Sequence, residues 1–304
     1  MFNKTKFWLS SLWKFSRPHT IIGTSLSVFS LYFLTIATTN ISITKINFIL
    51  MLGAWISCLL GNLYIVGLNQ LIDVEIDKIN KPNLPLASGD FSLKQGQIIV
   101  IISGLFALIS SLFLGWWLFL TVLISLIIGT AYSLPPLRIK RFPLPAAFCI
   151  FTVRGVIVNL GLFFHFTQQL TGEKVLNSSV LLLSLFIIVF TVAIAIFKDV
   201  PDTEGDKKYQ INTFTILVGK DKIFNITRWI ITVSYLSLMI GAFLFDSIVN
   251  YEFLVISHLL LLTLLWIRSH KVNLDLKIEI ASFYQFIWKL FFLEYLLFST
   301  AYFI

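Results

Sequence analysis

The chain alternates long apolar runs with short polar connections. Since a helix of about 20 apolar residues crosses the hydrocarbon core of a bilayer, each long run predicts one transmembrane helix. We expect nine spans, at residues 19–38, 46–69, 95–114, 116–134, 143–165, 176–197, 226–245, 249–267 and 283–303. The pattern therefore predicts an all-α integral membrane protein, a single domain over residues 1–304 built as a bundle of about nine transmembrane helices.

The third and fourth spans lie in one uncharged run from Gln95 to Leu137, which is too long for a single crossing. Gly115 divides this run, and Trp116 and Trp117 follow it directly. Because tryptophan favours the membrane–water interface, the position predicts a tight turn at the membrane surface.

Composition supports the membrane class. Of all residues 57% are hydrophobic and only 12% are charged, with a mean hydropathy of +0.89. Soluble domains carry about 25% charged residues. Cys58 and Cys149 lie inside apolar runs, which is typical of cysteines buried as small hydrophobic residues. Their positions do not indicate a disulfide framework.

The net charge of +8 raises the question of nucleic-acid binding, but the distribution of the charge excludes it. With nine spans, 19 of the 23 Lys and Arg residues fall on one side of the membrane. Only Lys45 and Lys174 fall on the other side, and two lie inside spans. Since basic connections stay in the cytoplasm, the pattern predicts a cytoplasmic N-terminus and the lipid bilayer, not nucleic acid, as partner.

The N-terminus shows neither a cleavable signal peptide nor an Arg- and Ser-rich transit segment. Its basic start runs directly into the first span. This indicates a bacterial or an organelle-encoded protein.

One acidic cluster follows the second span. Asn69, Asp73 and Asp77 are spaced by four residues. On a helix, residues four apart drift by only about 40°, so we expect these three on one face. Glu75 is expected on the opposite face.

A second cluster follows the sixth span, also on the cytoplasmic side. Asp199, Asp202 and Asp206 are spaced by three and four residues, which predicts a shared helical face. Glu204 is expected to point away, and Gly205 to end the helix.

Carboxylates this close repel one another. At about 4 Å and an effective dielectric constant near 20, each pair costs about 4 kcal/mol. Divalent cations remove this cost, and oxygen ligands with retained water suit Mg²⁺. Solvated loop acids are the alternative, but two matching clusters favour two facing walls of one site for metal and phosphate.

Basic residues near the clusters are candidates to hold phosphate oxygens. Lys81 follows the first cluster, and Lys198 directly precedes Asp199. Arg138 and Lys140 lie in a polar connection that begins near Tyr132. Membrane orientation alone also places basic residues here, so each taken singly is ambiguous.

Polar residues inside spans are costly and point to specific contacts. Arg154 in the fifth span either binds an anionic substrate group or pairs with Glu294 in the ninth. Lys289 and Glu294 are expected either to pair with each other or to reach the membrane surface by snorkelling. His165 and His258 are expected to be interfacial or hydrogen-bonded structural histidines.

At these residues the chain resembles the UbiA superfamily of intramembrane aromatic prenyltransferases. Asn69-x-x-x-Asp73-x-x-x-Asp77 is similar to the first Asp-rich motif of that family, and Asp199-Val-Pro-Asp202-Thr-Glu-Gly-Asp206 is similar to the second. Tyr132-Ser133-Leu134-Pro135-Pro136 resembles a third family motif. The nine-helix count agrees, so the resemblance covers nearly the whole chain.

Shorter sequence motifs resemble those of the homogentisate prenyltransferases in this superfamily. The stretches Asn69–Asp73 and Asn80–Gly89 carry this resemblance, as does Arg17-Pro18-His19-Thr20 at the first span. Many relatives have Asp where this chain has Gln70. Chlorophyll synthases usually have an Arg-Pro-Ile-Pro run where this chain has Asn83-Leu84-Pro85-Leu86.

The resemblance implies Mg²⁺-dependent transfer of a prenyl group from its diphosphate to homogentisate with decarboxylation, in tocopherol or plastoquinone synthesis. Phytyl diphosphate is the expected donor, with geranylgeranyl and solanesyl diphosphate as alternatives. This activity fits a cyanobacterial cell or thylakoid membrane, or a plastid membrane. Other acceptors, as in chlorophyll synthases and naphthoate prenyltransferases, stay open. A cation-coupled transporter is the rival class, but transporters place their sites near the bilayer midplane.

The resemblance also implies residue roles. Asp73, Asp77, Asp202 and Asp206 are expected to be catalytic, and Mg²⁺ is expected on both clusters. Arg17 and Arg154 are the candidates for the aromatic substrate, Arg154 because of its position inside a span and with Glu294 left open as its partner. The diphosphate is expected at five residues: Lys81, Tyr132, Arg138, Lys140 and Lys198.

Overall fold

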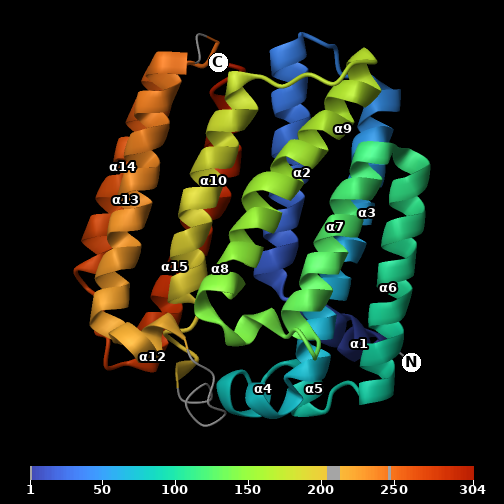
Figure 1. Ribbon diagram of the computed structural model, residues 1–304, viewed down its shortest axis with the longest axis vertical. Coiled ribbons are helices and arrows are strands. Elements are labelled where there is room, and N and C mark those ends of the chain that lie inside the picture. The colour runs from blue at the N-terminus through green and yellow to red at the C-terminus, as the bar shows by residue number, and fades with distance from the viewer. Residues whose placement is uncertain (1, 204–212, 246–247) are drawn as a thin grey trace.

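The structure is a computed structural model that describes residues 2–203, 213–245 and 248–304. Within these ranges it is helical, and nine helices are long and apolar enough to cross a membrane. They lie side by side in Figure 1. Their bounds are α2 Pro18–Thr39, α3 Lys45–Ile72, α6 Leu93–Leu114, α7 Trp116–Ser133, a composite span Pro143–Thr171, α10 Ser178–Phe197, α13 Lys220–Phe245, α14 Tyr251–Ser269 and α15 Lys277–Thr300.

These helices confirm the nine spans that the apolar runs predict. The fifth span ends six residues after its expected end, and α13 and α15 each begin six residues before their expected start. Their first turns carry charged residues, such as Lys220 and Glu279, that continue the helix beyond its apolar part. Apolarity marks the part of a helix that lies in the bilayer and not its full length.

The fifth span is not one regular helix. It consists of α8 Pro143–Phe151, the π-helix η2 Thr152–Val158 and α9 Asn159–Thr171. π-Helical turns inside α-helices are rare and occur often at functional sites. This irregular turn carries Arg154.

Five short helices lie at one end of the bundle, which is the lower end in Figure 1. They are α1 Phe2–Phe15, α4 Val74–Asn80, α5 Pro85–Ser88, η1 Ile139–Arg141 and α12 Phe214–Val218. A small buried cluster joins α1 and α5 to the spans through Phe15, Leu86, Phe91 and Val100. These short elements give the bundle one elaborated end.

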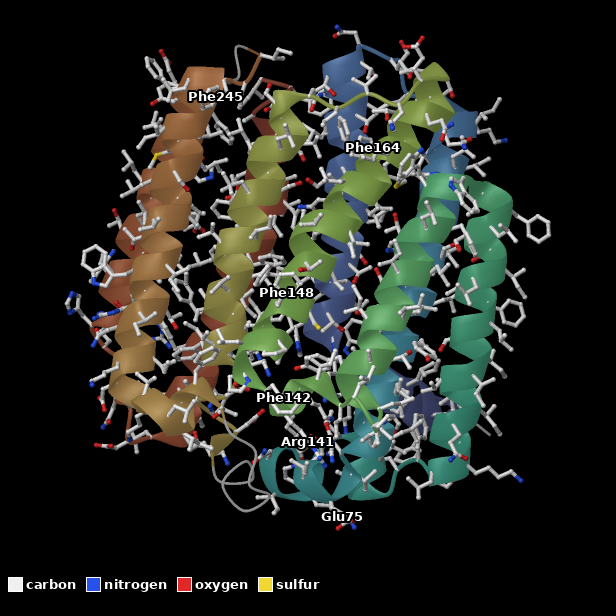
Figure 2. The ribbon with its side chains drawn as sticks, in the orientation of Figure 1. Glu75, Arg141, Phe142, Phe148, Phe164 and Phe245 are labelled. Carbon is white, nitrogen blue, oxygen red and sulfur yellow. The ribbon has the colours of Figure 1, made fainter. Side chains whose placement is uncertain are left out.

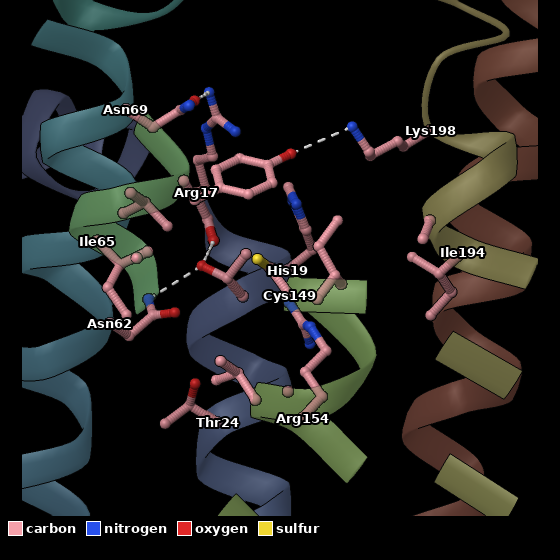
Figure 3. A pocket seen from close by; sticks show the side chains of 18 of the residues that line it. Arg17, His19, Thr24, Asn62, Ile65, Asn69, Cys149, Arg154, Ile194 and Lys198 are labelled. Carbon is pink, nitrogen blue, oxygen red and sulfur yellow. Dashed lines mark hydrogen bonds between the residues drawn. The ribbon is translucent and has the colours of Figure 1, made fainter. Parts of the chain in front are cut away.

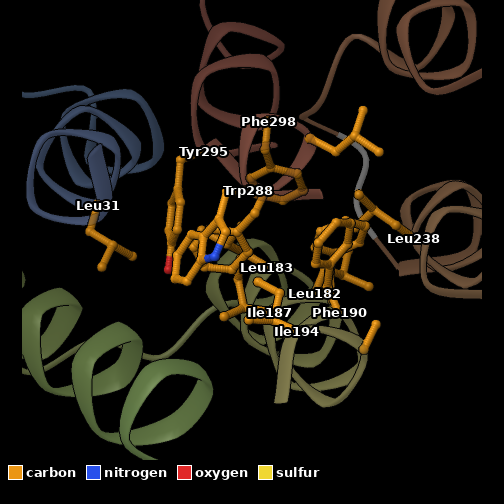
Figure 4. Packing of buried hydrophobic residues seen from close by; sticks show 14 of the residues in the cluster. Leu31, Leu182, Leu183, Ile187, Phe190, Ile194, Leu238, Trp288, Tyr295 and Phe298 are labelled. Carbon is orange, nitrogen blue, oxygen red and sulfur yellow. The ribbon is translucent and has the colours of Figure 1, made fainter. Parts of the chain in front are cut away.

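Six spans surround a central pocket. The helix α2 contacts α3, α9 and α15, while α10 contacts α8, η2 and α15. The helices α6, α13 and α14 pack outside this ring, against α3, α10 and α15. Figure 4 shows the core where α10 meets α15, with Leu183, Phe190, Trp288 and Tyr295 in close packing.

The outer surface is apolar along the spans. Phe113 is 86% exposed, and many other large apolar side chains on α6, α13 and α14 are also exposed. A surface of this kind is unfavourable in water but not in hydrocarbon. The exposed band therefore marks the lipid-facing surface of an integral membrane protein.

The predicted turn at Gly115 is confirmed. Its φ of 149° lies in a region that other residues rarely adopt, and α7 begins directly after it at Trp116. Trp116 is exposed, as expected of an interfacial tryptophan.

Gly155 allows η2 and α10 to approach closely. An added Cβ would lie 2.4 Å from Ile188 Cγ1 and 3.0 Å from the Ile188 backbone. We expect Gly155→Ala to lower the unfolding free energy by about 1–3 kcal/mol, because the backbone of α10 has to shift. Thermal unfolding in detergent measures the effect. The control is Gly61→Ala, where the nearest atom is 3.8 Å away, and equal melting temperatures for the two variants would contradict the prediction.

Candidate functional site

Both acidic clusters line one pocket at the elaborated end of the bundle. The pocket has a volume of about 670 Å³, and α2, α3, α4, α7, α10, α15 and the composite fifth span contribute to its wall. Of the six predicted metal ligands, it is lined by Asn69, Asp73, Asp77, Asp199 and Asp202. Asp206 lies outside the described residues, as do Glu204 and Gly205.

The first cluster does not lie on one continuous helix, which corrects the prediction. The helix α3 ends at Ile72, and Asp73 has φ −106° and ψ 17° before α4 begins at Val74. Hydrogen bonds from Asp73 N to Asn69 O (3.1 Å) and from Asp77 N to Asp73 O (2.7 Å) preserve the four-residue spacing. The chain therefore bends at Asp73 while all three side chains stay on the pocket.

Glu75 points away from this cluster, as predicted. Its side chain is 67% exposed and pairs with Lys78 at 2.7 Å. In Figure 2 it lies at the outer tip of the elaborated end.

The described part of the second cluster also departs from the helical prediction. The helix α10 ends at Phe197, and Asp199 and Asp202 follow in a turn. The Thr203 hydroxyl donates to the carbonyls of Val200 (2.9 Å) and Asp199 (3.2 Å), which holds the turn. The turn, and not a helical face, directs the two aspartates to the pocket.

Basic side chains pair with the aspartates. Arg138 Nη2 lies 3.1 Å from Asp73 Oδ1, and Lys140 pairs with the other oxygen of the same carboxylate. Lys198 pairs with Asp199 at 2.9 Å. These contacts bring the predicted basic residues into the same site as the carboxylates.

Lys81 connects the two walls of the pocket. It ends α4 in the first cluster, and its ammonium pairs with Asp202 in the second. Residues about 120 positions apart in the sequence are therefore in direct contact.

Lys198 also reaches Tyr132, since its ammonium donates to the Tyr132 hydroxyl at 3.3 Å (Figure 3). Burial alone would lower the pKa of Lys198, but Asp199 and Tyr132 raise it well above its usual value. Lys198 is therefore positively charged at neutral pH. Burial lowers the pKa of Lys140, and Asp73 counteracts this effect.

Two arginines at the first cluster have left-handed backbone conformations. Arg17 has φ 51° and Arg138 has φ 37°. Arg17 Nη2 donates to Asn69 Oδ1 at 3.1 Å and lies 3.9 Å from Asp77 Oδ2 (Figure 3). Arg138 does not line the pocket and supports Asp73 from the side. Such conformations are uncommon in residues other than glycine and cluster at functional sites.

The donor set fits Mg²⁺. Asp77 Oδ2 is buried and has no hydrogen-bond partner, so it is a carboxyl oxygen left without a donor. In the described ranges, no three Asp, Glu, His or Cys side chains converge as an all-protein metal cage. Mg²⁺ usually binds through one or two carboxylates, substrate phosphates and water instead. Carboxylates and an amide spread over two walls match this mode.

The alternatives at Glu294 are resolved differently from the prediction. Glu294 pairs neither with Arg154 nor with Lys289. Its carboxylate binds His258 Nε2 at 2.9 Å, and both side chains are fully buried. His258 Nδ1 lies 2.6 Å from the Leu254 carbonyl, so this histidine is structural, as predicted.

Several pocket residues were not anticipated from the sequence. They include His19, Asn62 and an aromatic row on α15 formed by Tyr284, Trp288, Phe291 and Tyr295. The spacing of four, three and four residues places this row on one helical face. That signal was present in the sequence, but an aromatic row in an apolar span is equally typical of a core.

Comparison with known proteins places the chain. It is 57% identical to homogentisate phytyltransferase from Synechocystis over 96% of both chains. It is 42% identical to homogentisate phytyltransferase 1 from Arabidopsis thaliana, covering 95% of this chain and 74% of that one. A solved UbiA homolog from Archaeoglobus fulgidus, bound to GPP and Mg²⁺, shares the fold with a TM-score of 0.66 at 16% identity, over 95% and 99% of the two chains. The UbiA prenyltransferase family model matches residues 26–290, and this chain belongs to that family.

Proposed function

We propose that this protein transfers a phytyl group from phytyl diphosphate to homogentisate, with Mg²⁺ and with loss of CO₂, in tocopherol-type prenylquinone synthesis. The observation that carries the proposal is one membrane pocket that joins two acidic clusters to a set of basic side chains. High identity to homogentisate phytyltransferases over nearly the full length supports the choice of substrates. The helix α4, which carries Asp77, lies at one end of the bundle (Figure 1), unlike the midplane sites of transporters.

The residues that would hold Mg²⁺ are Asn69, Asp73, Asp77, Asp199, Asp202 and Asp206. When bound, Mg²⁺ neutralises negative charge on the diphosphate and so favours its departure. The Asp73 and Asp202 carboxylates are proposed as the central ligands, since one lies on each wall.

Basic side chains would bind the remaining diphosphate oxygens. Lys81, Lys140 and Lys198 line the pocket, and Tyr132 lies beside Lys198. Fixed positive groups at a leaving group stabilise the charge that develops as the C–O bond breaks. Arg138 is predicted to act on the diphosphate as well, and its contact with Asp73 gives it a supporting position.

The apolar part of the pocket would protect the reaction. Leu126, Ile194 and Phe291 are among its lining residues. Such walls exclude water, which would otherwise capture the allylic cation before the electron-rich acceptor ring attacks it. The decarboxylated product is then a methylated, prenylated quinol.

The excess of basic residues at the elaborated end would place that end and the N-terminus in the cytoplasm. A cyanobacterial cell or thylakoid membrane, or a plastid membrane, is the proposed location. The similarity to the Synechocystis enzyme supports this location.

The proposal predicts that purified protein in detergent, given phytyl diphosphate, homogentisate and Mg²⁺, forms a methyl-phytyl quinol and one equivalent of CO₂. EDTA should abolish turnover, and added Mg²⁺ should restore it. Chromatography with mass detection and labelled homogentisate measure both products.

Competing substrates test specificity in the same assay. Geranylgeranyl and solanesyl diphosphates compete as donors, while chlorophyllide and dihydroxynaphthoate compete as acceptors. Preference for another acceptor would replace homogentisate in the proposal. Absence of any prenylated product would refute the activity itself.

A further inference from the structure

Arg154 is a cation in the wall of the pocket with no anion beside it. Its guanidinium lies 4.8 Å from the centre of the Trp288 ring and 5.9 Å from that of Phe291. Within the described ranges of the chain, its guanidinium contacts these two rings and forms no hydrogen bond or ion pair. A charged group inside a membrane bundle is costly unless an opposite charge or a functional ligand meets it.

Unlike Arg154, the other predicted cations of the site each have a polar partner. Lys81, Lys140, Lys198 and Arg138 each pair with an aspartate, and Arg17 contacts Asn69 and lies near Asp77. The carboxylate that was a candidate partner of Arg154 is already bound to His258. No carboxylate of the described residues pairs with Arg154, so its position suits an anionic group carried by a ligand.

The backbone holds Arg154 in this position. It lies on the π-helix η2, next to Gly155, whose close contact with Ile188 brings η2 against α10. The Arg154 Nη1 atom faces α2, 3.8 Å from the position of a Cβ built on Gly23. The side chain thus spans from η2 toward α2 and α15, across the pocket wall.

Arg154 lies apart from the proposed diphosphate site. In Figure 3, Asn69 and Lys198 lie at one end of the view and Arg154 lies at the other, with His19 between them. A small molecule that occupies the space near His19 would therefore have the basic cluster on one side and Arg154 on the other.

Aromatic rings line the region around Arg154. Trp288 packs against His19 with ring centres 4.9 Å apart and against Phe291 at 5.7 Å. Tyr284 and Tyr295 line the same pocket from α15. Flat aromatic faces beside an unpaired guanidinium match a ligand that has both a ring and a carboxylate.

We infer that Arg154, Trp288 and Phe291 form the binding subsite for the aromatic acid acceptor, with the guanidinium on its carboxylate and the rings against its ring. The inference rests on the proposed function, because it assigns the second substrate of that reaction. It separates the two substrates, since the diphosphate takes the lysines and Arg154 takes the carboxylate. It concerns binding of the acid before CO₂ leaves.

A neutral analogue tests the carboxylate contact. In 2,5-dihydroxyphenylacetamide, an amide replaces the carboxylate of homogentisate. We expect wild-type protein to bind the acid about 10- to 100-fold more tightly than the amide, as charged hydrogen bonds predict. In Arg154→Gln this preference should fall below about 3-fold. Calorimetry on the purified protein measures binding without turnover.

Steady-state kinetics supply the second readout. In Arg154→Gln the KM for homogentisate should rise by about 10- to 100-fold, while the KM for phytyl diphosphate changes by less than about 3-fold. Arg154→Lys keeps the charge and should restore part of the preference for the acid. Arg268→Gln is the control, because Arg268 is exposed on α14 and contacts Ser282.

An unchanged preference for the acid in Arg154→Gln would overturn the inference. So would an equal rise of both KM values, since that result indicates a diphosphate contact or a structural role. If Arg154→Gln does not fold, the same criteria apply to Arg154→Met, which also removes the charge. Product formation by wild-type protein tests the proposed function separately, so the two ideas can fail independently.

Discussion

Asp73→Asn should lower kcat for phytyl transfer by about 100- to 1,000-fold, the loss typical of removing one preorganised electrostatic contact. The substitution preserves the shape of the side chain but removes the negative charge from the wall formed by α3 and α4. It also leaves Arg138 and Lys140 without their common anion. Turnover at saturating Mg²⁺ and both substrates measures the effect.

The matched control lies two residues away. Glu75→Gln removes a carboxylate from the same end of the bundle, but that side chain is exposed and pairs with Lys78, three residues along the same helix. Glu75→Gln should leave kcat unchanged.

Asp202→Asn, on the opposite wall, should resemble Asp73→Asn and should also require more Mg²⁺ for half-maximal rate. Turnover near wild type in both aspartate variants would mean that other carboxylates carry the chemistry.

His258→Leu should lower the free energy of unfolding by about 3–5 kcal/mol, because it leaves Glu294 buried without its partner. Both side chains are fully buried between α14 and α15, and the second oxygen of Glu294 already lacks a hydrogen bond. Unfolding in detergent, followed by circular dichroism, measures the loss.

The double variant His258→Leu/Glu294→Leu separates the pair from its packing. It should recover much of the lost stability, since replacing both members of a buried pair with apolar residues is often neutral. His270→Leu is the control, because this histidine is exposed just after the same helix. A double variant less stable than His258→Leu would contradict the interpretation.

The spans were predictable because the requirement for crossing a membrane is visible in the local sequence. Each crossing needs a continuous apolar run, and Gly115 marks a turn by its own conformational freedom. The irregular turn η2 was not predictable, since neither Arg154 nor Gly155 in an apolar run specifies a π-helix. Gly155 on this turn packs closely against α10, a tertiary contact that local sequence does not specify.

Residue spacing predicted which side chains would gather at the pocket but not how the backbone presents them. The four-residue spacing from Asn69 to Asp77 survives a break at Asp73, and Asp199 and Asp202 lie in a turn. The partner of Glu294 was inaccessible to sequence reasoning, because α14 and α15 set that contact through their rotation. Local rules do not determine which faces of two helices meet.

The left-handed backbone at Arg17 and Arg138 lowers the stability of the fold, while the side chains of these arginines serve the site. Each such residue costs about 1–3 kcal/mol that glycine would not. Glycine at both positions would remove this backbone cost, but Asn69 and Asp73 would lose their contacts with Arg17 and Arg138. Selection for thermal stability alone would thus tend to replace these arginines, and the resulting protein would be more stable but inactive.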